Sequence, residues 1–293
     1  MAKITSLITG IPRSGTTLCC KLLNDRADVV ALHEPIEPSS LFQSTNPQQA
    51  VEAIAEQIAN LDHAITQGLP FVHGDKGGLD ISNPVGENLK EGIRQVEAKR
   101  GQIQLKARDA NSYQLVVKQN ALFTALMDTL SQRYPMVCIV RNPVDVLASW
   151  LSVDLPVNRG RIPAGEHFDS SLKQALDVTK NSLSRQLYIY QWFVDKFRQS
   201  GLPIIRYEDV LVSGGVVLDH ALGLTPIERD SLVAKERTFH QSTLAKLELA
   251  LPKLLVLDLG DLYTKQDIQL SFDRVIGNGI LSPIKELEDD AQE

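Results

Sequence analysis

The stretch Ile-Thr-Gly-Ile-Pro-Arg-Ser-Gly-Thr-Thr, residues 8–17, decides the fold class of this chain. It follows an apolar run, residues 4–8, that is typical of a short buried strand, and it precedes residues 18–23, which are typical of the first turns of a helix. Gly10 and Gly15 allow the backbone to curl, so that successive N–H groups can face one anion. Strand, glycine loop and helix in this order predict a phosphate cradle within an α/β fold.

The cradle differs from an ATP-binding P-loop at one position. The spacing of Gly10 and Gly15 is that of a P-loop, but a P-loop places lysine directly after the second glycine, where this chain has Thr16. The cation lies inside the loop instead, at Arg13. This change indicates that the bound phosphate is not the γ-phosphate of ATP.

A second motif lies at residues 136–150. Residues 136–140 are apolar and partly β-branched, which favours a central parallel strand. Asn142 and Pro143 are suited to the N-cap and first position of a following helix. Arg141 then lies at the carboxyl end of a strand, where open α/β sheets bind ligands, and Ser149 lies two turns into the helix. An arginine can hold a phosphate through two N–H groups, and a serine can add a third bond.

Both motifs resemble those of sulfotransferases that use 3′-phosphoadenylyl sulfate (PAPS), whose donor loop is Pro-[Arg/Lys]-Ser-Gly-Thr-Thr and whose 3′-phosphate motif has Arg and Ser eight residues apart. The resemblance covers about residues 4–40 and 115–210, and it is closer to soluble bacterial enzymes and to the tyrosylprotein and carbohydrate types than to the cytosolic type. It implies PAPS as co-substrate, PAP as product, and no metal. It also implies a donor site made of these residues: Pro12, Arg13, Ser14, Gly15, Thr16, Thr17, Arg141 and Ser149.

Sulfuryl transfer requires cations beside the leaving phosphate, and the sequence offers Arg13 and Lys118. Lys118 ends the apolar strand predicted over residues 115–118, so we expect it at the same edge of the sheet as Arg13 and Arg141. Lys118-Gln119-Asn120 resembles the Lys-Asp-Pro of tyrosylprotein sulfotransferases, in which the lysine supports the leaving group. Gln119 and Asn120 depart from that pattern.

The reaction also requires a base, and two neighbours, His33 and Glu34, follow the strand predicted over residues 28–32. The tyrosylprotein and carbohydrate types have a glutamate here, and Glu34 matches it. The cytosolic type uses a histidine from a later strand, where this chain has Asn120, which cannot act as a base. We therefore predict Glu34 as the base. One alternative is that His33 is the base. The other is that the Glu34 carboxylate only pairs with a nearby cation. Because neighbouring strand residues face opposite ways, we expect only one of the two to reach the acceptor.

Composition limits the class of protein. The chain has 293 residues, 43% hydrophobic content and a net charge of −6, which disfavours a general nucleic-acid binder. Its three cysteines show no disulfide or metal-ligand spacing, so we expect buried packing residues in a reducing compartment. No apolar run approaches the ~20 residues that span a bilayer, and the first predicted strand leaves no room for a signal peptide. The expected location is the cytoplasm, with no membrane partner.

The expected organisation is one α/β domain over residues 1–293, with a P-loop-type central parallel sheet flanked by helices and a helical and loop insertion over about residues 43–112. We expect helices over residues 46–65, 121–132 and 171–198, a strand over 204–207, and a largely helical segment from 210 to about 262. The glycine-rich residues 68–92 are interpreted as a lid over the acceptor, with a surface insert as the alternative. The acidic tail, residues 286–293, is expected to be solvated.

Three smaller features complete these expectations. Tyr207-Glu208-Asp209 resembles a triplet that ends a strand in sulfotransferases, and residues 276–279 faintly resemble a loop near the 3′-phosphate. Arg159 and Arg161 suggest an anionic acceptor, although a solvated loop is favoured. The acceptor itself, whether a sugar, phenol, lipid or peptide hydroxyl or an amine, is not predicted. The remaining alternatives are a P-loop kinase or NTPase and a non-catalytic protein that binds PAP or another nucleotide.

Overall fold

The computed structural model describes residues 4–44, 46–74, 85–90, 93–96, 99–234 and 237–277. Its centre is a sheet in which every pair of neighbouring strands is parallel. In spatial order the strands are β2 (Val29–His33), β7 (Gln114–Lys118), β1 (Thr5–Gly10), β8 (Met136–Val140) and β9 (Ile204–Arg206). The predicted α/β class with a central parallel sheet is confirmed.

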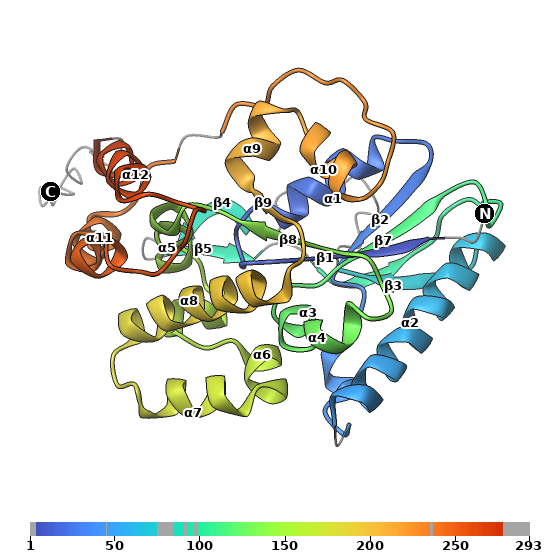
Figure 1. Cartoon of the computed structure of the whole chain (residues 1–293), viewed down its shortest axis with the longest axis horizontal. Coiled ribbons are helices and arrows are strands. Elements are labelled where there is room, and N and C mark those ends of the chain that lie inside the picture. Colours follow the sequence, from blue (N-terminus) through green and yellow to red (C-terminus); the bar gives the residue numbers. More distant parts are fainter. Residues whose placement is uncertain are drawn as a thin grey trace, which may run out of the picture.

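Helices cover both faces of this sheet (Figure 1). One face carries α1 (Thr16–Asn24), α9 (Tyr207–Val212) and α10 (Val216–Ala221). The other face carries α2 (Pro47–Gln67), α3 (Ala121–Ala125), α4 (Met127–Leu130), α6 (Pro163–Phe168), α7 (Ser170–Val178) and α8 (Ser182–Ser200). Beyond the β9 end lie α5 (Pro143–Leu151), α11 (Gln241–Leu254) and α12 (Lys265–Gly277).

Alternation along β1 explains how the sheet joins two cores. Leu7 belongs to the larger apolar core, on the side of α3 and α8, and Ile8 belongs to the smaller core beneath α1 and α10. Cys19 and Cys20 lie in the smaller core and Cys138 in the larger one, and all three are buried and free. Burial raises the pKa of the Cys20 and Cys138 thiols to about 12. The prediction of packing cysteines is confirmed.

The strand order places a topological switch at β1. From β1 the chain goes to β2 and returns to β7 on one side of β1, and it then continues with β8 and β9 on the other side. The loops after β1 and β8 therefore leave the carboxyl edge of the sheet side by side and in opposite directions. An open α/β sheet binds its ligands in this crevice.

Two short antiparallel ribbons and two 3₁₀ turns complete the described chain. The ribbons pair β3 (Phe71–His73) with β6 (Gly101–Ile103) and β4 (Val85–Lys90) with β5 (Ile93–Val96). The turns are η1 (Pro38–Leu41) and η2 (Pro156–Arg159). Residues 75–84 and 91–92 of the predicted lid over 68–92 lie outside the described residues, as do residues 278–279 of the faint C-terminal motif and the acidic tail 286–293.

Three predicted helices are wrong in extent. The helix expected over 171–198 is two helices, because Asn181 caps a new one by accepting a hydrogen bond from Ser184 N at 3.1 Å. The helix expected over 121–132 breaks at Leu126, where φ is −104° and ψ is 10°. The segment expected to be helical from 210 onward is non-helical over the described residues 224–234 and 237–240.

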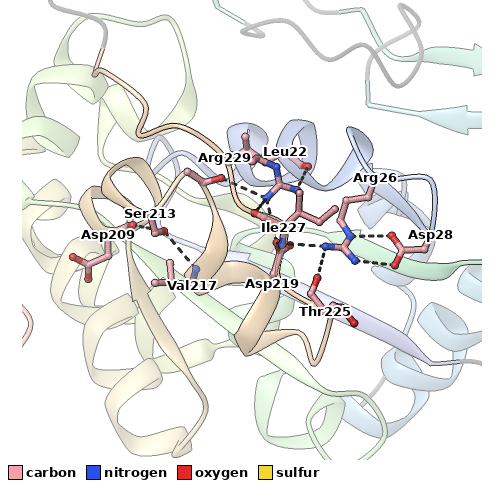
Figure 2. A network of polar contacts seen from close by, with 11 residues as sticks. Leu22, Arg26, Asp28, Asp209, Ser213, Val217, Asp219, Thr225, Ile227 and Arg229 are labelled. Carbon is pink, nitrogen blue, oxygen red and sulfur yellow. Dashed lines mark hydrogen bonds and ion pairs between the residues drawn. The ribbon is translucent and has the colours of Figure 1, made fainter.

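A buried charge network fixes the start of that non-helical segment (Figure 2). Asp219 is 1% exposed and lies 3.4 Å from Arg26 Nη1 and 3.1 Å from Arg229 Nη1. It also accepts a hydrogen bond from Ile227 N at 3.1 Å. Arg26 donates to the Thr225 carbonyl at 2.8 Å and Arg229 to the Leu22 carbonyl at 3.3 Å. The segment is thus attached to α1 before it continues towards the edge of the sheet.

Candidate active site

The carboxyl edge of the sheet borders a cavity of about 830 Å³. Of the site residues predicted from the sequence, all but Ser14 and Ser149 line it. The two exceptions are buried beside it: Ser14 Oγ donates to the Ile139 carbonyl at 3.1 Å, and Ser149 Oγ accepts from Arg13 Nε at 3.2 Å. The structure therefore brings every predicted site residue to this cavity or directly behind its wall.

The loop after β1 has a backbone that few residues can adopt. Arg13 has φ 73° and Gly15 has φ 86°. A Cβ atom at Gly15 would lie 2.2 Å from Cδ2 of Tyr207, and one at Gly10 would lie 2.7 Å from the Ile139 carbonyl oxygen. Both glycines are required because a ring and a strand pass so close to the loop. The first turn of α1 begins at Gly15 without any side-chain cap, which leaves its N–H groups facing the cavity edge for an anion.

Arg141 is held firmly at the end of β8. Its Nη2 pairs with Asp145 Oδ1 at 2.9 Å, and its guanidinium lies 4.6 Å from the centre of the Tyr207 ring. Its Nη1 reaches the Arg13 carbonyl at 3.5 Å, so the two predicted phosphate-binding loops touch. The Nε of Arg141 is buried without a hydrogen-bond partner among the described residues. Such a donor, in a lining rich in cations, is suited to an anion.

Asp145 holds the Arg141 side chain in position. It accepts hydrogen bonds from Ser271 Oγ and Arg274 Nη2, both at 2.6 Å, in addition to Arg141. Burial opposes its ionisation, but the charge of Arg141, the Ser271 hydrogen bond and Arg274 outweigh burial and lower the pKa of Asp145. The carboxylate therefore stays charged and keeps Arg141 in place.

Cations crowd the donor loop. Burial, followed by the charges of Arg237, Arg94 and Arg141, lowers the pKa of Arg13 to about 9, with Glu34 acting in the opposite direction. Burial and then Arg237 lower the pKa of Arg94 to about 10. Glu34 is the one acidic side chain among the described residues that line the cavity. The cavity therefore has an excess of positive charge that a bound anion would relieve.

Glu34 and Lys118 form an ion pair at the same edge. Lys118 is 2% exposed, and its Nζ donates to Glu34 Oε1 at 2.7 Å. The charge of Lys118 lowers the pKa of Glu34 against the opposing effect of burial. Glu34 has φ 50°, and its N–H donates to the Lys118 carbonyl at 2.7 Å. Arg13 and Glu34 are the two non-glycine residues of the described chain with positive φ, and such backbone strain is concentrated at functional sites.

His33 lies next to Glu34 but is packed differently. It is buried, its ring meets the His73 ring edge-on at 4.5 Å, and its N–H donates to His73 Nε2 at 3.2 Å. Both His33 and Glu34 border the cavity, which strand alternation alone does not predict. The reason is the left-handed backbone at Glu34, which ends the alternation of β2.

The sequence did not predict two residues that line the cavity, Arg237 and Tyr207, or Arg94, whose charge acts on Arg13. Arg94 lies on β5, and its Nη2 donates to Ser152 Oγ at 2.8 Å. Arg237 borders the cavity from the non-helical segment expected to be helical. Tyr207 belongs to the triplet predicted as structural; within it, Glu208 accepts from Asn142 N and from the Tyr263 hydroxyl, which confirms the structural role for Glu208. No spacing pattern in the sequence marks either arginine.

The geometry as a whole fits transfer of an anionic group. One end of the cavity has the uncapped N–H groups of α1 and several guanidinium groups. The Glu34 carboxylate and the buried Lys118 ammonium lie beside this end. Within the described residues, no three or more histidine, cysteine, aspartate and glutamate side chains form a group that could hold a metal. Nor does any helix of this part of the chain have the length and apolarity to cross a membrane.

The match to a protein family agrees with this chemistry. The sulfotransferase domain family matches residues 3–211. Two solved structures align over nearly the whole chain. The sulfotransferase from Alicyclobacillus acidocaldarius is 14% identical, with 94% of this chain and 97% of that chain covered and a TM-score of 0.40. The sulfotransferase domain from the curacin biosynthetic pathway is 15% identical, with 93% and 98% covered and a TM-score of 0.38. Curated protein sequences give no match. Because the family match spans well over half of its residues, the chain belongs to the sulfotransferase domain family.

Proposed function

We propose that this sulfotransferase takes its sulfuryl group from PAPS and transfers it to an acceptor hydroxyl, with Glu34 as the general base. The observation that carries the proposal is the contact between the two motifs: Arg141 reaches the Arg13 carbonyl, so two guanidinium groups far apart in sequence face one cavity. The partnerless Arg141 Nε and the mutual repulsion around Arg13 both fit a doubly phosphorylated nucleotide.

Each end of the donor has candidate ligands. The loop Pro12–Thr17 and the uncapped start of α1 would hold the 5′-phosphosulfate. Arg141 would hold the 3′-phosphate, with Arg237 close by. The resemblance assigns Ser149 to the 3′-phosphate as well. The Ser149 oxygen already accepts a hydrogen bond from Arg13 Nε, so Ser149 would bind the phosphate by donating its hydroxyl proton.

The chemistry then divides between Glu34 and Lys118. Glu34 takes the proton of the acceptor hydroxyl as the acceptor oxygen bonds to sulfur. The bond from sulfur to the 5′-phosphate oxygen breaks, and its electron pair stays on PAP. Once protonated, Glu34 no longer neutralises Lys118, so the ammonium charge becomes available to the leaving phosphate. No step needs a second nucleophile.

We further place the acceptor side at the insertion over residues 43–112 and the helices that face it. Gly74 and Arg100, both from this insertion, line the cavity. The buried free cysteines fit a reducing compartment, and we expect the enzyme to act in the cytoplasm.

Thermal melting with PAP, ATP and NAD tests the donor. We expect PAP to raise the melting temperature more than the other two, because charge-assisted bonds contribute about 1.5–3 kcal/mol each. Arg141→Ala should remove most of this shift, whereas Arg133→Ala, a surface arginine beside Tyr134, should keep it. Equal stabilisation by ATP, with magnesium-dependent hydrolysis, would show a P-loop NTPase instead. Tight PAP binding without transfer to any acceptor would show a non-catalytic nucleotide-binding protein.

A further inference from the structure

The antiparallel ribbon of β3 and β6, which belongs to the insertion, reaches the end of β2. β3 ends at His73, β6 begins at Gly101, and these two residues are paired. Gly74 and Arg100, the residues just beyond the pair, therefore leave the ribbon at the same end, and both line the cavity. We call His73, Gly74 and Arg100 the ribbon end. It contacts the chain on both sides of Glu34.

Before Glu34, the ribbon end bonds to the backbone of His33. The His33 N–H donates to His73 Nε2 at 3.2 Å, and the His33 carbonyl accepts from the Gly74 N–H at 3.2 Å. A Cβ atom on Gly74 would lie 2.3 Å from this carbonyl oxygen, so the close approach requires a glycine. The last residue of β2 is thus held by both of its backbone polar groups.

After Glu34, Arg100 bonds to two successive carbonyl groups. Its Nη2 donates to the Pro35 carbonyl at 2.7 Å and its Nη1 to the Ile36 carbonyl at 3.3 Å. The planar guanidinium, with its several fixed donors, can span both carbonyls. Arg100 also lies 3.4 Å from Glu37, but that carboxylate is half exposed and such a pair contributes little. Among the described residues, Arg100 is the one group that bonds the Pro35 carbonyl.

The backbone of Glu34 needs such support. Its φ is 50°, and a non-glycine residue keeps a left-handed backbone only where its surroundings fix it. The two bonds of Glu34 both go to Lys118: its N–H donates to the Lys118 carbonyl at 2.7 Å, and its Oε1 accepts from Lys118 Nζ at 2.7 Å. Relaxation of this turn would move the carboxylate away from Lys118 and from the position in which it meets an acceptor. A misplacement of about 1 Å can cost roughly 10²-fold in rate.

We propose that the ribbon end is a clamp that fixes the position of Glu34, with Arg100 as its main positioning residue. The inference rests on the proposed function, because it concerns the base of that reaction. Arg100 acts here through Glu34 and not on the reacting atoms. The insertion then has a second role besides bordering the acceptor side, since it holds the turn that carries the base.

Hydrogen exchange and carboxyl titration of the ligand-free protein test the clamp without an acceptor. Arg100→Met keeps an unbranched side chain and removes both carbonyl bonds. We expect the Glu34 N–H to exchange about tenfold faster or more, because loss of hydrogen bonds from a charged group favours local opening. Lys118, His33 and Arg100 all lower the pKa of Glu34. This pKa, followed by NMR on the signal absent from Glu34→Gln, should rise in the variant, because the turn no longer holds the carboxylate against Lys118 and the charge of Arg100 is lost.

Two further variants serve as controls. Arg108→Met removes a bond of the same kind at the other end of β2, where Arg108 Nη1 donates to the Ala27 carbonyl at 2.9 Å, and it should change neither quantity. Arg100→Lys keeps the charge but cannot span two carbonyls, so the Glu34 N–H should still exchange faster than in the wild type. This variant also carries the test if Arg100→Met does not fold. All three variants should keep the Kd of PAP, because the donor loop is unchanged.

Three results would contradict the clamp. The first is unchanged exchange at Glu34 in folded Arg100→Met, which would leave Arg100 no influence on the turn. The second is full restoration of both quantities by Arg100→Lys, which would show that the charge alone is sufficient. The third is weaker PAP binding by Arg100→Met, which would place its action at the donor loop instead.

The Glu34→Gln variant separates this inference from the proposed function. Faster exchange at Glu34 in Arg100→Met, together with full PAPS turnover by Glu34→Gln, would keep the clamp and remove the role of Glu34 as base. Loss of turnover in Glu34→Gln, together with unchanged exchange in Arg100→Met, would keep the base and remove the clamp.

Discussion

Lys118 Nζ donates a 2.7 Å hydrogen bond to Glu34 Oε1, and this pair links the ends of two neighbouring strands at the mouth of the cavity. The ammonium is almost fully buried, whereas the carboxylate is 48% exposed. Glu34 can therefore meet an acceptor while Lys118 holds it from behind. The pair places a proton acceptor and a cation at adjacent positions, as sulfuryl transfer requires.

Glu34→Gln tests the base directly. The amide cannot accept a proton, so we expect kcat/KM to fall about 10²- to 10⁴-fold. PAP binding, measured by calorimetry, should persist because the donor loop is unchanged. Glu37→Gln is the matched control, since Glu37 is an exposed glutamate of the same segment that pairs with Arg100. Full turnover by Glu34→Gln would exclude the assignment.

The pH dependence of kcat/KM separates Glu34 from His33. Lys118 lowers the pKa of Glu34 below its ordinary 4.5, so the carboxylate is ionised at any higher pH. We expect no acidic loss of activity between about pH 5 and 8, whereas an unperturbed histidine base would produce one near pH 6.5. The ion pair likewise stabilises the fold fully above pH 4.5, and this contribution is lost as pH falls through the lowered pKa.

Lys118→Met provides the complementary measurement. The variant removes both the charge and the hydrogen bond of Lys118, which lower the pKa of Glu34, so this pKa should rise. The acidic limb of the profile should therefore move to higher pH, whatever the loss in kcat. An acidic limb near pH 6.5 in the wild-type enzyme that does not move in this variant would identify His33 as the base.

Much of the site followed from local patterns in the sequence. Gly10 and Gly15 indicated the anion loop, and Asn142 indicated the start of α5, where its Oδ1 accepts from Val144 N at 3.0 Å. Such signals depend on neighbours in the chain, so one sequence carries them. The strands β1, β7 and β8 were placed to within one or two residues, because their apolar runs are continuous.

What could not be predicted depends on contacts distant in sequence. Arg237 reaches the cavity because Asp219, Arg26 and Arg229 attach its segment to α1 (Figure 2). Nothing near residue 237 records those partners. In the same way, one of the ion pairs that neutralise Arg161 comes from Asp177 on α7, sixteen residues away, so the charge of Arg161 looked available in the sequence.

Arg13→Gly is expected to weaken PAP binding without lowering the stability of the ligand-free protein. A non-glycine residue in the left-handed region costs about 1–3 kcal/mol, and Arg13 is also surrounded by other guanidinium groups. Without ligand, the variant should melt no lower than the wild type, despite losing its bond to Ser149. The PAP-induced thermal shift should largely disappear. A clearly lower melting temperature of the ligand-free variant would show that Arg13 supports the fold.

Asp219→Ala is expected to destabilise the protein from outside the cavity. The substitution leaves Arg229 and the Nη1 group of Arg26 without their buried counter-charge, which typically lowers the free energy of unfolding by about 3–5 kcal/mol. Asp28 keeps two hydrogen bonds to Arg26, so the loss should be near the lower end of this range. Denaturant unfolding measures this loss, and Asp209→Ala, a 52% exposed partner of Arg206, is the control, with a change of about 0.5 kcal/mol or less. Because the same network directs the chain to Arg237, the folded fraction of Asp219→Ala should also bind PAP more weakly. Normal PAP affinity in that fraction would mean that the position of Arg237 does not depend on Asp219.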